Sequence, residues 1–465
     1  MGKEALRSGV GFLGDIVSAG GTQHPRYAAV TRLKEFTGSL KRRADDKLER
    51  TSIENGKWIQ YKPISSLTDD SPIEFVIPAN GEEYTDLTQS LLHIEATIVK
   101  DDGTKVEEAL VEEMGPVNNW LHSLFSQVDL YINHKLVSPQ NNTYAYRAYL
   151  ENLLNYGGSA KKSHLTSTMF YEDIADKMDD CEANNAGLVK RRDFVKKSTY
   201  IDMVGNLHLD LCNQAKFMLN GVEMRLRLVR SRNSFAIMSK TATNYKVHIR
   251  EANLFVRRCK INPGVLVAHS KTLESGTAKY PITRVDVKSI TLPSGILGKT
   301  LDSVFLGQLP KRIIVGLVDN VAFNGDFKKN PFNFQHFNLN YFALYIDGEQ
   351  VPCKALTPAF TGDSKLYALA YHTLFTGTGI QFADKGNEIG RSAYPNGYCL
   401  MAFDLTPDMS AGESSHWNLV RNGNLRIELQ FKEALASSIN CIVYAEMDNV
   451  IEVDRHRNVS VDFSG

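Results

Sequence analysis

The sequence lacks the features that mark disulfide-stabilised and zinc-binding proteins. Only six of its 465 residues are cysteines, and they form no CxxC pair and have no histidine at zinc-ligand spacing. They are Cys181, Cys212, Cys259, Cys353, Cys399 and Cys441. We expect reduced thiols that are mostly buried, because free cysteine behaves as a small apolar side chain.

Long hydrophobic runs and net charge are also missing. The longest apolar runs, such as residues 313–318, are far shorter than the roughly 18 residues of a membrane-spanning helix. Residues 1–21 lack the unbroken apolar core of a signal peptide. Lys plus Arg and Asp plus Glu each number 53, so no global field favours nucleic acid or an anionic membrane. We expect a soluble protein made in the cytosol.

Motifs of catalysis and cofactor binding are absent as well. The chain has no GxxxxGK[ST], HExxH, GxSxG or HxH pattern. The run "GVGFLG", residues 9–14, fits GxGxxG, but only eight residues precede it, so the strand that a dinucleotide site requires has no room. We predict no catalytic, cofactor-binding or metal-binding residues, no cofactor and no small-molecule substrate.

The histidines and carboxylates do not form a recognisable site in the sequence. Asp129 and Asp404 are too isolated to indicate an acid–base pair. The scattered histidines are interpreted as structural, and they include His122, His134, His208, His336 and His372.

The sequence is rich in short alternating apolar runs. Residues 1–58 form a distinct arm, with a short amphipathic stretch and the charged run "KRRADDKLER". From residue 73 onward, runs such as "IEFVIPANG" and "GVEMRLRLV" alternate with turns rich in Gly, Pro, Asn and Asp. This pattern is typical of an all-β protein built from sandwiches or barrels.

The second half of the chain repeats the first. "LYINHKLV" from Leu130 resembles "LYIDGEQV" from Leu344, 214 positions later, and Pro78 of "VIPANG" pairs with Pro293 of "TLPSG", 215 positions later. Three more matches follow in the same order: "AY" at 148 and 370, "LDL" at 209 with "FDL" at 403, and "NGVEMRLRL" at 220 with "NGNLRIEL" at 422. Five ordered matches indicate one β domain used twice.

These repeats divide the chain into four parts. We expect an arm at 1–58, a first β domain at 59–262, a linker with a short helix at 263–280, and a second β domain with a C-terminal tail at 281–465.

The stretch from Asn118 to Gly158 predicts a hairpin followed by an aromatic helix. The residues Asn133-His134 suit a two-residue turn, as Asp347-Gly348 does in the second copy. We expect the tyrosines of the helix to pack it onto the sheet rather than to stack on bases. They are Tyr144, Tyr146, Tyr149 and Tyr156.

Two blocks of opposite charge lie close together. The acidic run "YEDIADKMDD" covers 171–180, and the basic run "VKRRDFVKK" covers 189–197. We interpret the pair as a long solvated loop, with a contact to nucleic acid or to a neighbouring subunit as the alternative.

Long stretches resemble one known family. "GQLPKRIIVGLVDNVAFNGDFKKNPFNFQHFNLNYFALYIDGEQVP", "NPGVLVAHSKTLESGTAKYPI" and "VYAEMDNVIEVDRHRNV" are similar to the hexon-like double jelly-roll major capsid proteins of Maverick/Polinton elements and adintoviruses, in the adenovirus hexon lineage. The resemblance covers about residues 64–461.

The resemblance implies an architecture and a function. It implies two tandem jelly-roll barrels of eight strands each, with short helices in the connecting loops. Three chains would form a pseudo-hexameric capsomer, and many capsomers an icosahedral shell around double-stranded DNA. The implied partners are other copies of the chain, penton or minor capsid proteins, and a weak contact with the packaged DNA. The implied location is the virion, after synthesis in the host cytoplasm and assembly in the nucleus or cytoplasm.

Two other functions stay open from the residues alone: a tandem jelly-roll glycan hydrolase and a carbohydrate-binding protein. A hydrolase should place a carboxylate pair in a pocket between the barrels, whereas a capsid protein should show broad faces for self-association.

Overall fold

The computed structural model describes residues 53–461, apart from 69–70, 108–112, 183, 242–243, 385 and 414–417. Strands make up 42% of the chain and helices 19%, so the predicted all-β class is confirmed. The arm predicted at 1–58 falls outside the described residues up to residue 52, as does the "GVGFLG" run. Within the described residues, no helix is both long and apolar enough to cross a membrane.

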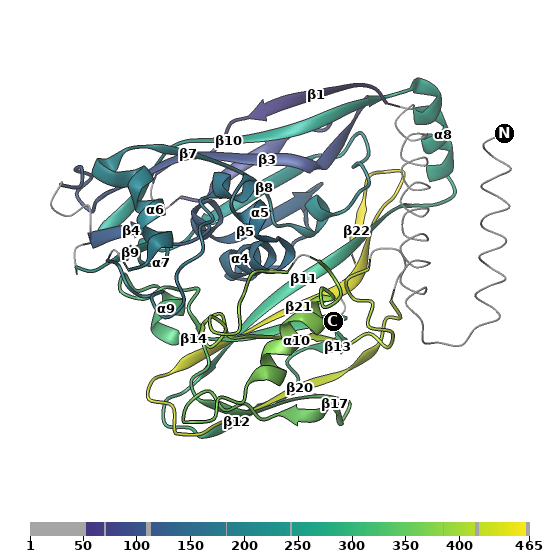
Figure 1. The fold of residues 1–465 in the computed structure, drawn as a ribbon. Helices are drawn as coiled ribbons and strands as arrows, with labels where there is room; N and C mark the ends of the chain where they lie inside the picture. Colours follow the sequence, from purple (N-terminus) through teal and green to yellow (C-terminus); the bar gives the residue numbers. More distant parts are fainter. Residues whose placement is uncertain are drawn as a thin grey trace, which may run out of the picture. The chain divides into compact units, whose positions relative to one another are not determined.

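The first half of the chain folds into two four-stranded sheets, with strand orders β1-β10-β3-β7 and β2-β8-β5-β6. Figure 1 shows these strands in purple to teal. Their bounds are β1 Ile53–Tyr61, β2 Ile73–Ile77, β3 Glu83–Lys100, β5 Phe125–Ile132, β6 Lys135–Leu136, β7 Ile201–Asn206, β8 Met224–Arg230 and β10 Tyr245–Ile261.

The second half forms two sheets with the orders β11-β21-β14-β19 and β12-β20-β16-β17, to which β22 and β13 add short pairings. Their bounds are β11 Ala278–Leu292, β12 Gly298–Leu301, β13 Leu306–Gln308, β14 Arg312–Asp319, β16 Leu339–Ile346, β17 Glu349–Leu356, β19 Leu400–Asp404, β20 Asn422–Phe431, β21 Ile439–Val453 and β22 Val459–Val461.

The two halves share one topology. When the strands of each half are numbered in chain order, both sheets of the first half have the same order as the sheets of the second. The repeated "LYI" segments lie in β5 and β16, which occupy the same place in their sheets. Both predicted two-residue turns have positive φ at each position, as type I′ turns require. The molecule is therefore a double jelly roll.

The match between Pro78 and Pro293 is wrong. Pro78 follows β2, which corresponds in the sheet order to β12, but Pro293 follows β11, which corresponds to β1. The two prolines end different strands. Their spacing agreed with that of the "LYI" pair because the extra residues 294–311, which include β12, are offset by the greater length of β3 and of the connection that follows it in the first half.

The alternating sequence pattern places the apolar side chains inside each barrel. Alternate residues of β2, Ile73, Phe75 and Ile77, are almost completely buried. In β20 the buried residues again alternate, from Leu425 to Phe431. A strand with one face in the core gives this period of two.

Short helices fill the connections between strands. They are α3 Trp120–Ser123, α4 Tyr144–Asn155, α5 Gly158–Lys161, α6 Ala186–Val195, α7 Asn233–Ala236, α8 Pro263–Leu273, α9 Asn320–Asn324 and α10 Ala368–Thr378. Helix α8 falls inside the predicted linker and ends three residues before Gly276. The four domain limits given above remain a prediction.

Candidate assembly site: the seam between the barrels

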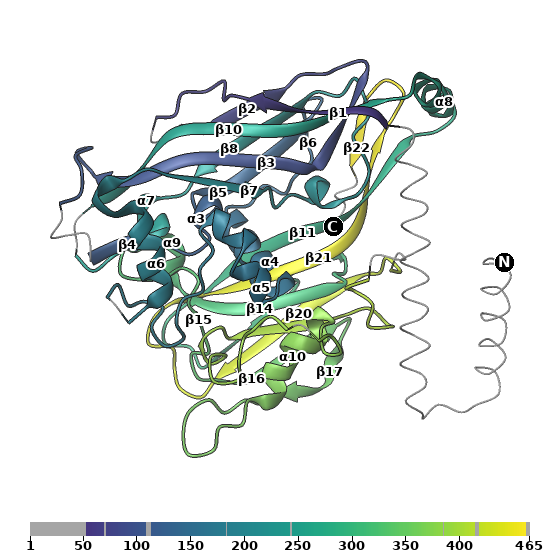
Figure 2. The same ribbon diagram turned by 45° about the horizontal axis from the view of Figure 1, so that its top comes forward.

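Helix α4 lies at the seam between the two barrels. It contacts β5 of the first barrel and β11 of the second, as both views show (Figures 1 and 2). Of its residues only Asn155 is not buried. The helix that the sequence predicted to cover its own barrel therefore also joins the barrels to each other.

The tyrosines of α4 show how this contact is made. Tyr149 stacks on Phe332, with ring centroids 4.1 Å apart, and Tyr146 stacks on Phe323 at 5.6 Å. Both phenylalanines belong to the second half of the chain. Packing rather than base stacking is confirmed for these tyrosines, but their main aromatic partners lie across the seam. Tyr156 is 38% exposed, so its predicted packing is wrong.

A buried group of charges runs along the same helix. Arg147 donates from Nε to Glu151 Oε1 at 2.8 Å, and its Nη2 lies 2.8 Å from Asp210 Oδ1. All three side chains are more than nine-tenths buried. Burial alone would lower the pKa of Arg147, but the two carboxylates outweigh it and raise the pKa.

Glu151 also bonds to a histidine. Its Oε2 lies 2.5 Å from Nδ1 of His208. Burial would raise the pKa of Glu151, but Arg147 and His208 together lower it to about 2. This carboxyl is therefore ionised at neutral pH, whereas a hydrolase's general acid needs a raised pKa.

The second barrel supplies matching charges. Tyr444 Oη lies 3.4 Å from Glu151 Oε1 and 3.1 Å from Glu446 Oε1. Arg312 Nη1 is 3.2 Å from Glu446 Oε2. Polar contacts thus run without a break from Asp210 in the first barrel to Arg312 in the second.

These charged groups border an open cleft of about 940 Å³ between the barrels. Its walls also include Lys311, paired with Asp448 at 2.5 Å, and the histidines His122 and His208. Among the carboxylates that line the cleft, Glu151, Glu446 and Asp448 are each paired with a cation of the protein, and Glu413 is exposed. The cleft has carboxylates, as the hydrolase alternative requires, but the three paired ones are held in ion pairs.

Two of the five histidines meet at the seam. The rings of His122 and His208 are 4.6 Å apart, and His122 Nδ1 is 3.1 Å from Tyr144 Oη. Burial, and then the neighbouring His208, lower the pKa of His122 well below its usual value. Across the described residues, no group of three or more His, Cys, Asp or Glu side chains is arranged to hold a metal ion.

The isolated carboxylates have local partners. Asp129 Oδ1 accepts a hydrogen bond from Gln127 Nε2 at 2.7 Å, and Asp404 accepts hydrogen bonds from the backbone N–H groups of Thr406 and Ala411.

All six cysteines are free and only Cys353 is exposed, which confirms the expectation of mostly buried thiols.

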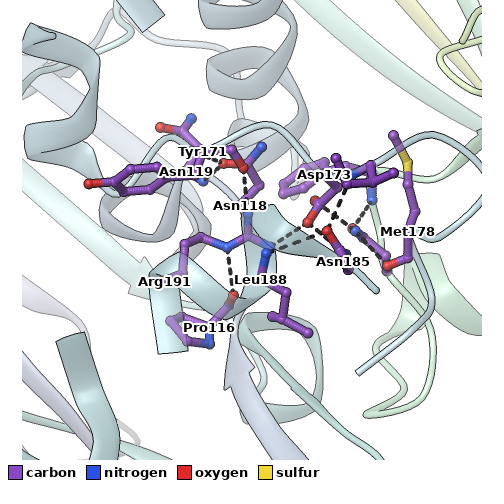
Figure 3. Close-up of polar contacts among 12 residues, drawn as sticks. Pro116, Asn118, Asn119, Tyr171, Asp173, Met178, Asn185, Leu188 and Arg191 are labelled. Carbon is purple, nitrogen blue, oxygen red and sulfur yellow. Dashed lines mark hydrogen bonds and ion pairs between the residues drawn. The ribbon is translucent and has the colours of Figure 1, made fainter. Parts of the chain in front are cut away.

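The two charged blocks form a second connection between the barrels. Figure 3 shows the contacts of Arg191 and Asp173 within the first half of the chain. Arg191, on α6, is fully buried and donates to Asp173 Oδ1 at 2.6 Å, to the Pro116 oxygen at 2.9 Å and to the Tyr171 oxygen at 2.5 Å. Asn185 begins α6: its side chain accepts from Leu188 N and donates to Asp173 Oδ1 at 3.0 Å. The side-chain acceptor at the helix start is a standard N-cap.

Residues of the second barrel complete this network. Asn330 Nδ2 donates to Asp173 Oδ2 at 3.0 Å, and Tyr398 Oη donates to the Asp173 backbone oxygen at 2.6 Å. Asp176 N donates to the Asn396 oxygen at 2.9 Å. We call the segment Tyr171–Val195 the brace, because it connects the first barrel to these residues of the second.

The prediction of a solvated loop is wrong for the centre of this segment. Asp173, Arg191 and Arg192 are all buried. The charge pattern showed that opposite charges lie close together along the chain, but it could not show that one pair turns inward. Outer residues Ile174 and Phe194, exposed by 44% and 46%, leave the other side of the brace open to solvent.

The barrels and their seam define the class of this molecule: a double jelly-roll protein. No family model matches the sequence. A curated relative, an uncharacterized protein of Caenorhabditis elegans, is 26% identical over 428 residues, which cover 89% of this chain and 98% of that protein.

Several solved structures have a similar fold. A chain of the Sputnik virophage matches with a TM-score of 0.58 and 11% identity, covering 89% of this chain and 90% of that one. VP54 of PBCV-1 matches with a TM-score of 0.54 and 9% identity, and a chain of the PBCV-1 virus capsid with 0.52 and 10%; each match covers 88% of this chain and 97% of the other. The double jelly roll predicted from the sequence is thereby confirmed.

Proposed function

We propose that the protein is a major capsid protein that assembles into trimeric, pseudo-hexameric capsomers and, through them, into an icosahedral shell around double-stranded DNA. The observation that carries the proposal is the double jelly roll itself, which over 88–89% of the chain is similar to chains from a virophage and a virus capsid. The sequence resemblance to Maverick/Polinton and adintovirus capsid proteins supports the same lineage, related to the adenovirus hexon.

The seam supports a role as a rigid building block. A shell subunit must keep its two barrels in one orientation so that identical copies make identical contacts. Two sets of contacts connect the barrels: the buried charges at α4 and the hydrogen bonds of the brace. Interiors packed in this way deform little, so the pair can act as a single block.

Partners and location follow from this function. The principal partner is the chain itself, first in the trimer and then between capsomers. Penton or minor capsid proteins would occupy other positions of the shell, and contact with the packaged DNA would be weak because the chain has no net charge. The protein would be synthesised in the host cytoplasm, assemble in the nucleus or cytoplasm, and reside in the virion.

The glycan hydrolase remains the second candidate, because the cleft between the barrels contains Glu151 and Glu446. Both carboxylates are paired with arginines, and the low pKa of Glu151 suits an ion pair better than proton donation. The cleft favours a structural role, and a carbohydrate-binding protein has no further support from it.

Electron microscopy of the purified full-length protein tests the proposal. We expect particles with six lobes around a three-fold axis and, at high concentration, closed shells or flat arrays of such particles. The protein would instead be a glycan hydrolase if it formed dispersed two-lobed particles at every concentration and released sugars from a panel of glycans.

A further inference from the structure

Helix α8 has apolar side chains around most of its first half. Its sequence is "PGVLVAHSKTL", and among these eleven described residues only Leu273 is buried. Val265, Leu266 and Val267 are consecutive, so their side chains point about 100° apart around the helix axis. Val267 is 68% exposed, and the other two are partly buried. A helix that packs on one side has a single apolar stripe, so this pattern indicates a second contact.

A helix of this length needs such a contact. Isolated helices shorter than about 12–15 residues are marginal in water, and packing of an apolar face supplies most of the stability of helices in proteins. The start of α8 is capped, because Asn262 Oδ1 accepts a hydrogen bond from Gly264 N at 2.9 Å. The cap fixes where the helix begins, but it leaves the apolar side chains of the first two turns uncovered.

The preceding part of the chain, residues 1–52, joins β1 next to the start of α8. Strand β1 begins at Ile53 and pairs with β10, and Asn262 alone separates the end of β10 from α8. Asn262 Nδ2 donates to Glu54 Oε1 at 3.3 Å, so the second residue of β1 contacts the residue that caps α8. The segment that precedes β1 is therefore connected to the protein within a few residues of the helix.

The nearer part of this segment has the sequence pattern of an amphipathic helix. Its apolar residues are spaced by four, three and four positions, which places them in one stripe. They are Ala29, Leu33, Phe36 and Leu40. Gly38 lies between them and is a poor helix former, so this segment, like α8, needs a partner for its apolar side chains.

The link between this stripe and β1 is long enough to reach all of α8. About a dozen residues separate Leu40 from Ile53 and can span up to about 40 Å, whereas the eleven residues of α8 are about 16 Å long. Because the link is covalent, the effective concentration of the stripe at the helix is in the millimolar range, well above the concentration of a second chain in dilute solution. The segment of the same chain is therefore favoured over that of another copy.

We propose that residues 29–40 dock on α8 of the same chain, with their apolar stripe against the apolar first half of the helix. The contact covers the apolar side chains of two segments that are marginal helices when alone. Apolar residues at this spacing are those that interlock when two helices pack side by side. The inference goes beyond the proposed capsomer and does not depend on it, since both segments belong to one chain.

Hydrogen–deuterium exchange of the full-length protein tests the contact from the side of residues 29–40. In Leu33→Glu/Phe36→Glu, which places charge in the stripe, we expect the amides of α8 to exchange about tenfold faster or more, because the helix loses its cover. Leu6→Glu/Leu13→Glu is the matched control, since it changes two apolar residues outside 29–40, and it should keep the wild-type exchange. Equal exchange in all three proteins would overturn the inference, as would the same acceleration by the control.

Trypsin tests the contact from the side of α8. Cleavage after Arg32 requires residues 29–40 to leave the helix, so its rate follows the population of the undocked state. Val265→Glu/Val267→Glu should be cut there about tenfold faster than the wild type, with circular dichroism to establish that the protein is folded. Leu366→Glu/Leu369→Glu is the matched control, because these two leucines at α10 are 67% and 59% exposed, and it should be cut at the wild-type rate.

Two outcomes of the trypsin experiment would contradict the inference. Equal cleavage rates in the wild type and both variants would show that α8 does not hold the segment. A wild-type rate that falls as the protein concentration rises would show that the segment of a second copy occupies the helix. We expect the wild-type rate to be the same at about 0.1 and 10 μM, because docking within one chain does not depend on concentration.

Discussion

Arg191 and Asp173 form an ion pair at 2.6 Å in which neither side chain has more than 1% of its surface exposed. Two charges removed so completely from water need nearly all of their hydrogen bonds satisfied by the protein. Here backbone oxygens from two segments accept hydrogen bonds from Arg191, and side-chain amides from both barrels donate hydrogen bonds to Asp173. The pair therefore links the stability of the brace to the presence of the second barrel.

Replacing Asp173 with alanine should destabilise the protein by about 3 kcal/mol or more, because it leaves the Arg191 charge buried without its partner. The measurement is urea unfolding of the full chain. The control is Asp193→Ala, which removes an exposed partner of Lys196 at 3.5 Å and should change the stability by less than about 1 kcal/mol. Equal effects of the two substitutions would show that the buried pair does not hold the brace.

Gly187, at the start of α6, lies against the backbone of the same segment. A Cβ built on this residue would be 2.2 Å from the Glu172 oxygen, so Gly187→Ala must shift the helix. We expect a loss of about 1–3 kcal/mol, as for other overpacked sites. Gly81→Ala is the control, since nothing lies within 4 Å of its Cβ position. A Gly187→Ala protein as stable as Gly81→Ala would contradict the close approach seen here.

His122 should make the protein less stable in mild acid. Its pKa in the folded state is lowered by burial and by His208, so between its usual value and the lowered one the unfolded chain binds a proton that the folded chain does not. Stability is then complete above about pH 6.5 and falls with decreasing pH, by at most about 1.4 kcal/mol per pH unit for one group.

Melting temperatures at pH 7.5 and 5.5 test this dependence. The difference between the two should be smaller for His122→Asn than for the wild type, while the substitution His372→Asn, at an exposed position, should keep the wild-type difference. If His122→Asn loses as much stability on acidification as the wild type, the acid sensitivity arises elsewhere.

The fold could be predicted largely from local patterns. Alternation of apolar residues, the turns at Asn133-His134 and Asp347-Gly348, and the repeated "LYI" strands all depend on residues close together in the chain. Such signals persist because strand period and turn geometry are local properties of the backbone. Pro78 and Pro293 show the limit: a short match at a strand end does not identify which strand it ends.

The seam could not be predicted in this way. Tyr149 and Phe332 lie far apart in the sequence, one in each barrel, and their stacking depends on how the barrels meet. Nor does the sequence distinguish Arg191, which is fully buried, from Lys190 beside it, which is not. Which charged residue turns inward is decided by the acceptors that surround it in the folded chain.

The mass of the assembled protein tests the central claim most directly. Sedimentation equilibrium of the wild-type chain at micromolar concentration should give a stable particle of about 156 kDa, three times the 52.0 kDa of one chain. Obligate contacts of this kind commonly bury more than about 2,000 Å², so the trimer should persist on dilution. A 52.0 kDa monomer that does not change on concentration would contradict the capsomer and with it the assignment as a capsid protein.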